Sequence, residues 1–194
     1  MPVTAALPTE PPEDAVVPDR HPDAPPPGEE MLSHFRFCFG CGVDHPTGLH
    51  LRVYAGEGLT THSQFTVSEH HQGAPGLAHG GLLAAAFDEA LGSLNWLLRR
   101  PAVTGRLETD FRRPVPVGSV LYIDAEVRGQ AGRKVYTRAR GALDAPDGPV
   151  AVTAAALFVQ VPLTHFTTHG RPEDVAQARA DVAAGAVRSY EVNP

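Results

Sequence analysis

The chain has 194 residues, of which 42% are hydrophobic and 20% charged, and its formal net charge at pH 7 is −6. This length fits one domain with a proper core, and the absence of a concentrated basic surface excludes a general nucleic-acid-binding protein. No apolar run approaches the roughly 18 residues of a membrane-spanning helix, and the N-terminus lacks the pattern of a secretory signal. We therefore expect a cytoplasmic protein with no membrane partner.

The first 30 residues differ in composition from the rest of the chain. They are rich in proline and acidic residues and poor in large apolar residues. Such a segment buries too little apolar surface to offset the entropy lost on ordering. The sequence predicts a disordered acidic tail over residues 1–30, a folded domain over 31–165 and a C-terminal extension over 166–194 that contains a weak helical pattern from Pro172.

Strand and helix patterns alternate along the domain. Apolar and polar residues alternate around residues 49–54 and 65–67, which predicts two strands. A polar, glycine-rich loop over 68–78 leads into a long apolar helix over 80–98, which Pro101 ends. Four further strands, separated by turn residues, form an expected antiparallel meander and cover residues 103–111, 120–128, 134–143 and 150–161.

The two sides of the predicted helix have different side chains. One broad side carries the residues that a sheet can cover, namely Leu83, Phe87, Ala90, Leu94, Leu97 and Leu98. At about 100° per residue, Gly81, Ala85, Asp88 and Gly92 gather on the opposite side. This small-residue side leaves room for a ligand or for a second copy of the chain, and it favours a dimer that completes the site.

The start of this helix contains a candidate catalytic site. Gly80 and Gly81 leave backbone N–H groups open to a ligand at the positive end of the helix dipole. Asp88 lies seven residues after Gly81, about 700° around the axis and so on the same side of the helix. An oxyanion donor and a general base fit a hydrolase. The alternatives are a loose helix start and a solvated aspartate paired with Arg99 or Arg106.

The chain has two cysteines, Cys38 and Cys41, in a Cys-x-x-Cys arrangement. A structural zinc site needs four ligands, and no second cysteine pair follows. His34, His45 and His50 have no helical spacing. We interpret the cysteine pair as a structural turn and expect no metal. Glu89 points about 100° away from Asp88, so it is expected to be an ion at the surface or at an interface.

Several motifs together resemble a known family over about residues 37–161. They are Cys38-Phe39-Gly40-Cys41-Gly42, Pro46-Thr47-Gly48-Leu49, Pro75-Gly76-Leu77-Ala78-His79-Gly80-Gly81, Asp88, Val103-Thr104 and Phe111-Arg112-Arg113-Pro114-Val115-Pro116. With these motifs the chain resembles the hotdog-fold, PaaI-like acyl-CoA thioesterases of the thioesterase superfamily. The resemblance implies an α+β hotdog fold, in which a curved antiparallel sheet wraps around one long central helix.

The resemblance also implies catalytic roles. The amide of Gly81 would hold the thioester carbonyl oxygen, and His79 would shape the loop and help hold the acyl group. Asp88 would be the general base, with nucleophile as the alternative role, and Thr104 would assist from a strand. Related enzymes often have an asparagine six residues before this histidine, where the present chain has Gly73.

The substrate side of the site follows from the same resemblance. Gly80, Arg112 and Arg113 would bind the substrate, with the two arginines holding the phosphates of coenzyme A. The expected partners are an acyl-CoA and further copies of the chain, as a homodimer or homotetramer, and no cofactor is needed. Two other functions stay open, namely a non-catalytic acyl-CoA-binding or sensing protein and a hotdog hydratase or dehydratase. The acyl chain and the carrier are not determined.

Overall fold

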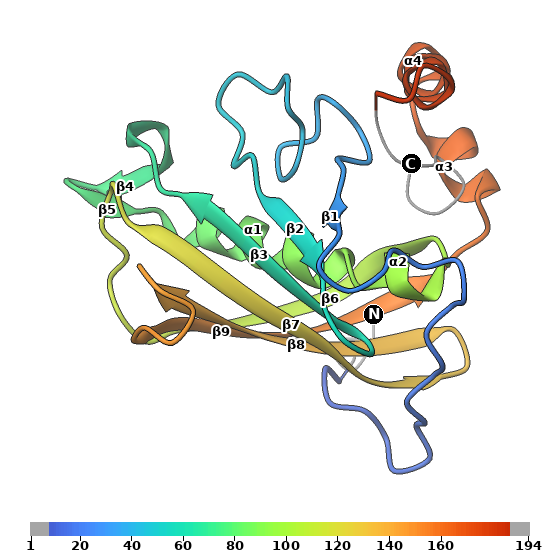
Figure 1. Ribbon diagram of the computed structural model, residues 1–194, viewed down its shortest axis with the longest axis horizontal. Helices are drawn as coiled ribbons and strands as arrows, with labels where there is room; N and C mark the ends of the chain where they lie inside the picture. The colour runs from blue at the N-terminus through green and yellow to red at the C-terminus, as the bar shows by residue number, and fades with distance from the viewer. Residues whose placement is uncertain (1–7, 187–194) are drawn as a thin grey trace, which may run out of the picture.

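The computed structural model describes residues 8–186 of the chain (Figure 1). Its elements in chain order are β1 Glu30–Met31, β2 Arg52–Ala55, β3 Thr60–Thr66, the 3-10 turn Glu69–His71, β4 Gln72–Ala74, β5 Leu77–Ala78, α1 Gly80–Gly92, α2 Asn95–Leu98, β6 Ala102–Phe111, β7 Val120–Ala131, β8 Lys134–Leu143, β9 Val150–Gln160, α3 Thr164–His169 and α4 Pro172–Ala183. Strands β6 to β9 lie within three residues of the predicted bounds.

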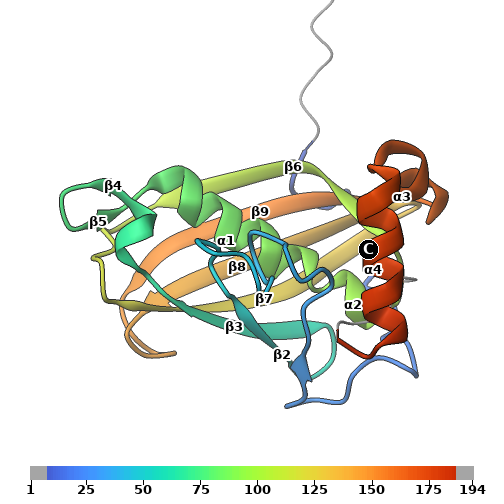
Figure 2. The ribbon, with the colours of Figure 1, turned by 90° about the horizontal axis from the view of Figure 1, so that it is seen from above.

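Within the described residues, one antiparallel sheet of seven strands forms the body of the domain. Its strand order is β1-β2-β3-β7-β8-β9-β6, and β4 and β5 form a separate two-stranded ribbon. Helix α1 lies across one face of the curved sheet, which bends around it (Figure 2). The α+β hotdog arrangement, predicted from the resemblance, is therefore confirmed.

The apolar side of α1 fills the concave face of the sheet. All six residues predicted to face the core are buried, and Phe87, Ala90, Leu94 and Leu97 have no exposed surface. They pack in one cluster with sheet residues that include Phe65, Ile123 and Val152. Burying a leucine or phenylalanine side chain contributes about 1.5–3 kcal/mol, so the contact between helix and sheet stabilises the fold.

The predicted helix over 80–98 consists of two helices rather than one. The Ser93 hydroxyl donates to the carbonyl of Ala90 at 2.7 Å, and the Asn95 amide donates to the carbonyl of Gly92 at 3.1 Å. The N–H of Leu94 bonds to Leu91, three residues back, at 3.3 Å. Polar side chains that bond to nearby carbonyls compete with the helical pattern, which explains the break between α1 and α2.

Strand β6 differs from the expected meander. It pairs with β9 rather than with β7, so the segment after β6 crosses to the far side of β8. β6 thus forms one edge of the sheet, and among the described residues no strand covers its outer side. Natural proteins rarely leave a long strand edge open, so this edge is a surface on which a second chain can add.

The segments on either side of the domain lie against it where they are described. In the N-terminal segment, Val16 bridges to Gln130, and the N–H of His21 donates to the carbonyl of Leu97 at 2.9 Å. In the C-terminal extension, α4 begins at Pro172, as the sequence predicts. Residues 1–7 and 187–194 of these two segments lie outside the described residues. The division of the chain into three parts stays a prediction.

The length and hydrophobicity of the helices show whether any of them could span a membrane. A membrane-spanning helix needs about 20 apolar residues. In the described part of the chain, no helix combines that length with sufficient hydrophobicity.

The packing of α1 against β8 can be tested with a glycine pair. A Cβ at Gly141 would lie 2.8 Å from Cζ of the buried Phe87, whereas a Cβ at Gly92 would meet Phe158 at 3.5 Å. We expect Gly141→Ala to destabilise the protein by about 1–3 kcal/mol through overpacking. Gly92→Ala should be neutral or stabilise by up to about 1 kcal/mol, because alanine favours a helix.

Urea unfolding followed by circular dichroism measures both effects. The proposed packing predicts opposite signs for the two variants, or at least a clear order between them. Equal free energies of unfolding for Gly141→Ala and Gly92→Ala would show that Phe87 is not tightly packed on β8.

Candidate active site

The start of α1 is built around His79. Its backbone is extended, and its Nδ1 accepts a hydrogen bond from the N–H of Gly81 at 2.9 Å. Its own N–H donates to the carbonyl of His71 at 2.8 Å. His79 is thus the N-cap of the helix. In this state, the Gly81 amide proposed for an oxyanion is already hydrogen-bonded.

The structure explains why this chain has Gly73 at the position where related enzymes often have an asparagine. A Cβ at Gly73 would lie 2.7 Å from the Cα of His79 and 2.8 Å from its Cβ. Strand β4 therefore passes too close to the capping histidine for any larger residue. The close approach of the two backbones requires glycine at this position.

A cavity of about 330 Å³ lies beside the start of α1. It is lined by Leu77, Ala78, Gly80, Leu83, Phe111, Arg112, Arg113, Pro114 and Val115. The structure therefore brings together the three residues predicted to bind substrate. Arg112 is exposed and lies 3.6 Å from Asp110, and its Nε donates to Thr153 at 3.3 Å. Its guanidinium can reorient toward an anionic ligand at little cost, since exposed ion pairs are weak.

Asp88 and Thr104 meet directly. The Thr104 hydroxyl donates to Oδ1 of Asp88 at 2.8 Å. The pairing of β6 with β9 shifts register between Thr104 and Arg106, so a bulge lies next to this contact. Bulges of this kind redirect side chains and occur often beside active sites.

The alternative arginine partners of Asp88 bind other groups. Arg106 donates to Glu108 at 2.9 Å, and Arg99 donates to the carbonyl of Asp23 at 3.5 Å. Burial raises the pKa of Asp88, and the hydrogen bond from Thr104 acts in the opposite direction. A carboxylate with a raised pKa is a better base near neutral pH than an exposed one.

Gly81 and Asp88 share a side of α1, but they are far apart along its axis. Seven residues at a rise of 1.5 Å each correspond to about 10 Å. A water molecule held by Asp88 therefore cannot reach a carbonyl bound at the start of the same helix. The angle around the helix places the two residues on one side, but this axial distance keeps them apart. The predicted site residues thus form two groups, one at the helix start and one at Asp88.

A second and larger hollow, of about 720 Å³, lies elsewhere. Strands β3, β6, β7, β8 and β9 line it together with Thr9 and Glu10 of the N-terminal segment. Of the predicted site residues, only Arg112 contributes to its wall. The residues predicted to bind substrate thus line the smaller cavity, whereas Asp88 and Thr104 line neither.

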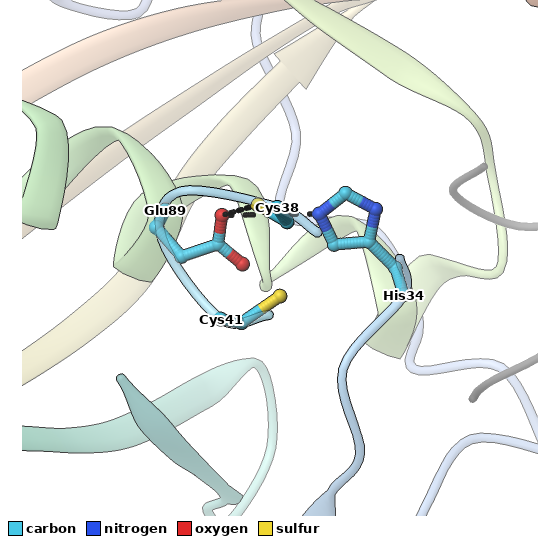
Figure 3. Close-up of side chains that lie close together, drawn as sticks. All are labelled: His34, Cys38, Cys41 and Glu89. Carbon is cyan, nitrogen blue, oxygen red and sulfur yellow. Dashed lines mark hydrogen bonds and ion pairs between the residues drawn. The ribbon is translucent and has the colours of Figure 1, made fainter. Parts of the chain in front are cut away.

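A third group of polar side chains, from the segment between β1 and β2, meets α1 at Glu89, the residue after Asp88. His34, Cys38, Cys41 and Glu89 offer one ligand atom each, and these four atoms lie within 4.8 Å of one another (Figure 3). Oε2 of Glu89 lies 3.5 Å from Sγ of Cys38 and 3.9 Å from Nε2 of His34. The interpretation of the cysteines as a simple turn missed this cluster.

The four groups share protons. Burial opposes the charged imidazole of His34, but hydrogen bonds with Cys41 and Glu89 outweigh it and raise its pKa to about 10. Hydrogen bonds from Cys38 and His34 hold the pKa of the Cys41 thiol well below its usual range. The hydrogen bond to Cys41 and burial raise the pKa of Cys38, and burial raises that of Glu89. The cluster is a polar network whose hydrogen bonds favour the thiolate form of Cys41.

The expectation that Glu89 is an ion at the surface or at an interface is wrong for the described chain. Its side chain is only 15% exposed and lies against Cys38 and His34. The side chain of Glu89 does point about 100° away from that of Asp88, but in this direction the loop of residues 34–41 covers it. A signal was present in the glycines of Cys38-Phe39-Gly40-Cys41-Gly42, because they allow that loop to lie tightly on the helix.

The family comparison matches the part of the chain that carries the predicted site. Residues 75–142 match the model of the thioesterase superfamily. The chain is similar to this superfamily over those residues, which make up less than half of its length. A relative, acyl-coenzyme A thioesterase THEM4 of Xenopus laevis, is 33% identical over 90 residues, which are 46% of this chain and 40% of that protein. The chain thus aligns with less than half the length of this relative.

Solved structures have the same fold. The thioesterase superfamily protein RHA08564 superposes with a TM-score of 0.58 at 26% identity, over 71% of this chain and 70% of that one. The PaaI protein of Escherichia coli, from the phenylacetic acid degradation operon, gives a TM-score of 0.51 at 18% identity, over 58% of this chain and 80% of that one. These superpositions agree with the hotdog fold of the chain.

The raised pKa of Asp88 gives a prediction about stability. Below the ordinary aspartate pKa of about 4, the carboxyl group is neutral in both folded and unfolded states. As the pH rises through the folded pKa, the burial of the charge lowers the stability of the folded protein. We expect Asp88→Asn, which is neutral and can still accept from Thr104, to be more stable than wild type at pH 7.

The measurement is urea unfolding of both proteins at several pH values between 4 and 8. The gain of Asp88→Asn should shrink as the pH falls and vanish near pH 4. A stability difference that does not change with pH would show that ionisation of Asp88 costs the folded state nothing.

Proposed function

We propose that this protein is an acyl-CoA thioesterase in which Asp88 activates the attacking water. The observation that carries the proposal is the contact between Thr104 and Asp88, at 2.8 Å, in a carboxylate whose pKa burial raises. The curated relative named as an acyl-coenzyme A thioesterase supports the choice of substrate class. Hydrolysis by this route uses only water and groups of the chain.

Each step of the reaction has a group that can perform it. Water gives a proton to Asp88 as its oxygen attacks the carbonyl carbon of the thioester. The negative charge that forms on the carbonyl oxygen is stabilised by the first N–H groups of α1, which have no helical acceptor. The C–S bond then breaks, and the leaving sulfur takes the proton from Asp88. The products are a carboxylic acid and the free thiol of coenzyme A.

The helix start offers two candidate donors for the carbonyl oxygen. Gly80 lines the 330 Å³ cavity, whereas the N–H of Gly81 donates to His79. Gly80 is therefore placed to meet a ligand directly, and Gly81 joins when the imidazole of His79 turns away. In the same cavity, Arg112 and Arg113 can bind the phosphates of coenzyme A, as guanidinium groups do well.

We further propose that the complete site needs two copies of the chain. About 10 Å of helix separates Gly81 from Asp88 in one copy, so a second α1 running antiparallel would bring its Asp88 beside the first copy's helix start. The open edge of β6 and the exposed Phe111, 52% exposed, lie on this side of the molecule. A two-fold dimer through these surfaces forms two equal sites.

The catalytic role of Asp88 is tested by its removal. Thiol release is measured with a panel of short, branched, aromatic and long acyl-CoAs. We expect Asp88→Ala to lower turnover at least about 100-fold, because general-base catalysis contributes a factor of that size or more. Thr104→Val removes the hydrogen bond that lowers the Asp88 pKa, so it should shift the acidic limb of the pH profile to higher pH.

Asp147→Asn is the matched control, because Asp147 is an exposed acid in a turn and should leave turnover unchanged. Equal rates for Asp88→Ala and wild type would contradict the mechanism. If wild type released no thiol from any acyl-CoA but bound them, the protein would be an acyl-CoA-binding protein instead. Hydration of an enoyl-CoA without thiol release would indicate a hydratase.

The two-copy site is tested by mixing inactive subunits. Asp88→Ala removes the base, and Gly80→Val fills the cavity beside the helix start. A mixed dimer then contains one site in which both groups are intact. After random mixing, half of the dimers are mixed and half of their sites are active, so we expect about a quarter of wild-type activity. If each site lies within one chain, mixing restores no activity.

A further inference from the structure

The cluster of His34, Cys38, Cys41 and Glu89 is not used by the proposed thioesterase reaction. Its four ligand atoms lie within 4.8 Å of one another and come from two separate parts of the chain. His34, Cys38 and Cys41 belong to the segment between β1 and β2, and Glu89 belongs to the middle of α1. In Figure 3 all four side chains point toward one common region.

The loop that carries the cysteines is shaped for this convergence. The N–H of Gly42 donates to the carbonyl of Cys38 at 2.9 Å, which turns the chain so that both sulfurs lie on one side. A Cβ at Gly42 would lie 2.5 Å from the same carbonyl oxygen, so the tight turn requires glycine. A Cβ at Gly40 would lie 2.5 Å from Oε2 of Glu89. The loop therefore rests directly on the carboxylate.

Backbone hydrogen bonds hold the loop in place from its other side. The N–H of Leu49 donates to the carbonyl of Phe39 at 2.8 Å, and the N–H of Leu51 donates to that of Gly40 at 2.9 Å. Leu49 and Leu51 are themselves buried in the core. The positions of the two cysteines are thus determined by the fold. A preorganised set of ligands binds an ion with little loss of free energy to rearrangement.

We propose that His34, Cys38, Cys41 and Glu89 bind one zinc ion as a structural site. Two thiolates, an imidazole and a carboxylate are ligand types that zinc accepts, and four protein ligands complete a tetrahedron. The two sulfur ligands disfavour magnesium and calcium, which prefer oxygen. With all four positions taken by the protein, no position is open for water or substrate, so the ion stabilises the fold rather than reacting.

The consequence of this site is a link between the cysteine loop and the helix of the candidate active site. Glu89 directly follows Asp88 in α1, so an ion bound to Glu89 holds the turn of the helix that carries the proposed base. Zinc binding would also displace the protons that the four side chains share, because an ion binds to deprotonated thiols and to a neutral imidazole. The buried carboxylate then has a cation as its partner.

The first experiment uses the full chain purified under reducing conditions. Elemental analysis should find about one zinc ion per chain, because the four protein ligands form a single site. After removal of zinc with a chelator, added Co²⁺ should produce the visible bands of tetrahedral cobalt and a charge-transfer band from thiolate to cobalt in the near ultraviolet. Added Zn²⁺ should abolish both.

Variants assign the ligands. Cys41→Ser and Glu89→Gln should each weaken Zn²⁺ binding at least about 10-fold, and Glu89→Gln should also shift the visible cobalt bands. His70→Ala is the matched control, because His70 is an exposed histidine outside the cluster, and it should bind the metal as wild type does. If Cys41→Ser fails to fold, Glu89→Gln and the cobalt spectrum of wild type still decide the question.

Two results would overturn the zinc site. One is a reduced wild-type chain, with both thiols titratable, that retains neither Zn²⁺ nor Co²⁺ in a one-to-one ratio. The other is a disulfide between Cys38 and Cys41 that persists in the reduced preparation, seen as a mass lower by two hydrogen atoms. Neither result depends on thiol release from acyl-CoA, so the site and the proposed activity fail or stand separately.

Discussion

Helix α1 has to meet two opposing demands, and the rest of the structure depends on how it does so. One side must be apolar and large enough to fill the concave face of the sheet, where Phe87 and Leu91 have no exposed surface. The adjoining sides must accommodate two neighbouring carboxylates, Asp88 and Glu89, without solvating either fully. Each acid therefore depends on a partner brought from elsewhere in the chain. Thr104 of β6 donates to Asp88, and the loop of residues 34–41 covers Glu89.

The two acids differ in what their surroundings allow. Asp88 accepts one hydrogen bond from a neutral hydroxyl group, so no positive charge neutralises its carboxylate. A base of this kind can take up and release a proton. Glu89 faces two thiols and an imidazole, an arrangement that suits a cation better than a proton, because a buried carboxylate without a charged partner is costly. Adjacent residues on one helix can thus be the proposed base and a proposed metal ligand, since side chains about 100° apart meet different parts of the fold.

Much of the fold could be predicted from the sequence. The alternation in the strands and the apolar side of α1 depend on near neighbours, and the structure confirms Leu83, Phe87 and Leu97 as core. The position of β6 could not be read in this way, because the partner of a strand is chosen by contacts across the sheet and not by its own pattern. The break between α1 and α2 was missed because Ser93 and Asn95 compete for backbone carbonyls only once the turn is formed.

The candidate site shows the same division between local and long-range information. The spacing of Gly81 and Asp88 predicted a shared side of the helix, but not the hydrogen bond by which His79 occupies the Gly81 amide. The cysteine pair looked incomplete as a metal site because its further ligands were sought nearby in the sequence as a repeated pattern. Glu89 lies 51 residues after Cys38 and reaches it only through the packing of the loop on α1. A ligand set that is assembled by tertiary contacts has no fixed spacing in the sequence. Its main sequence signal here is Gly40 and Gly42, where a Cβ would lie too close to neighbouring atoms.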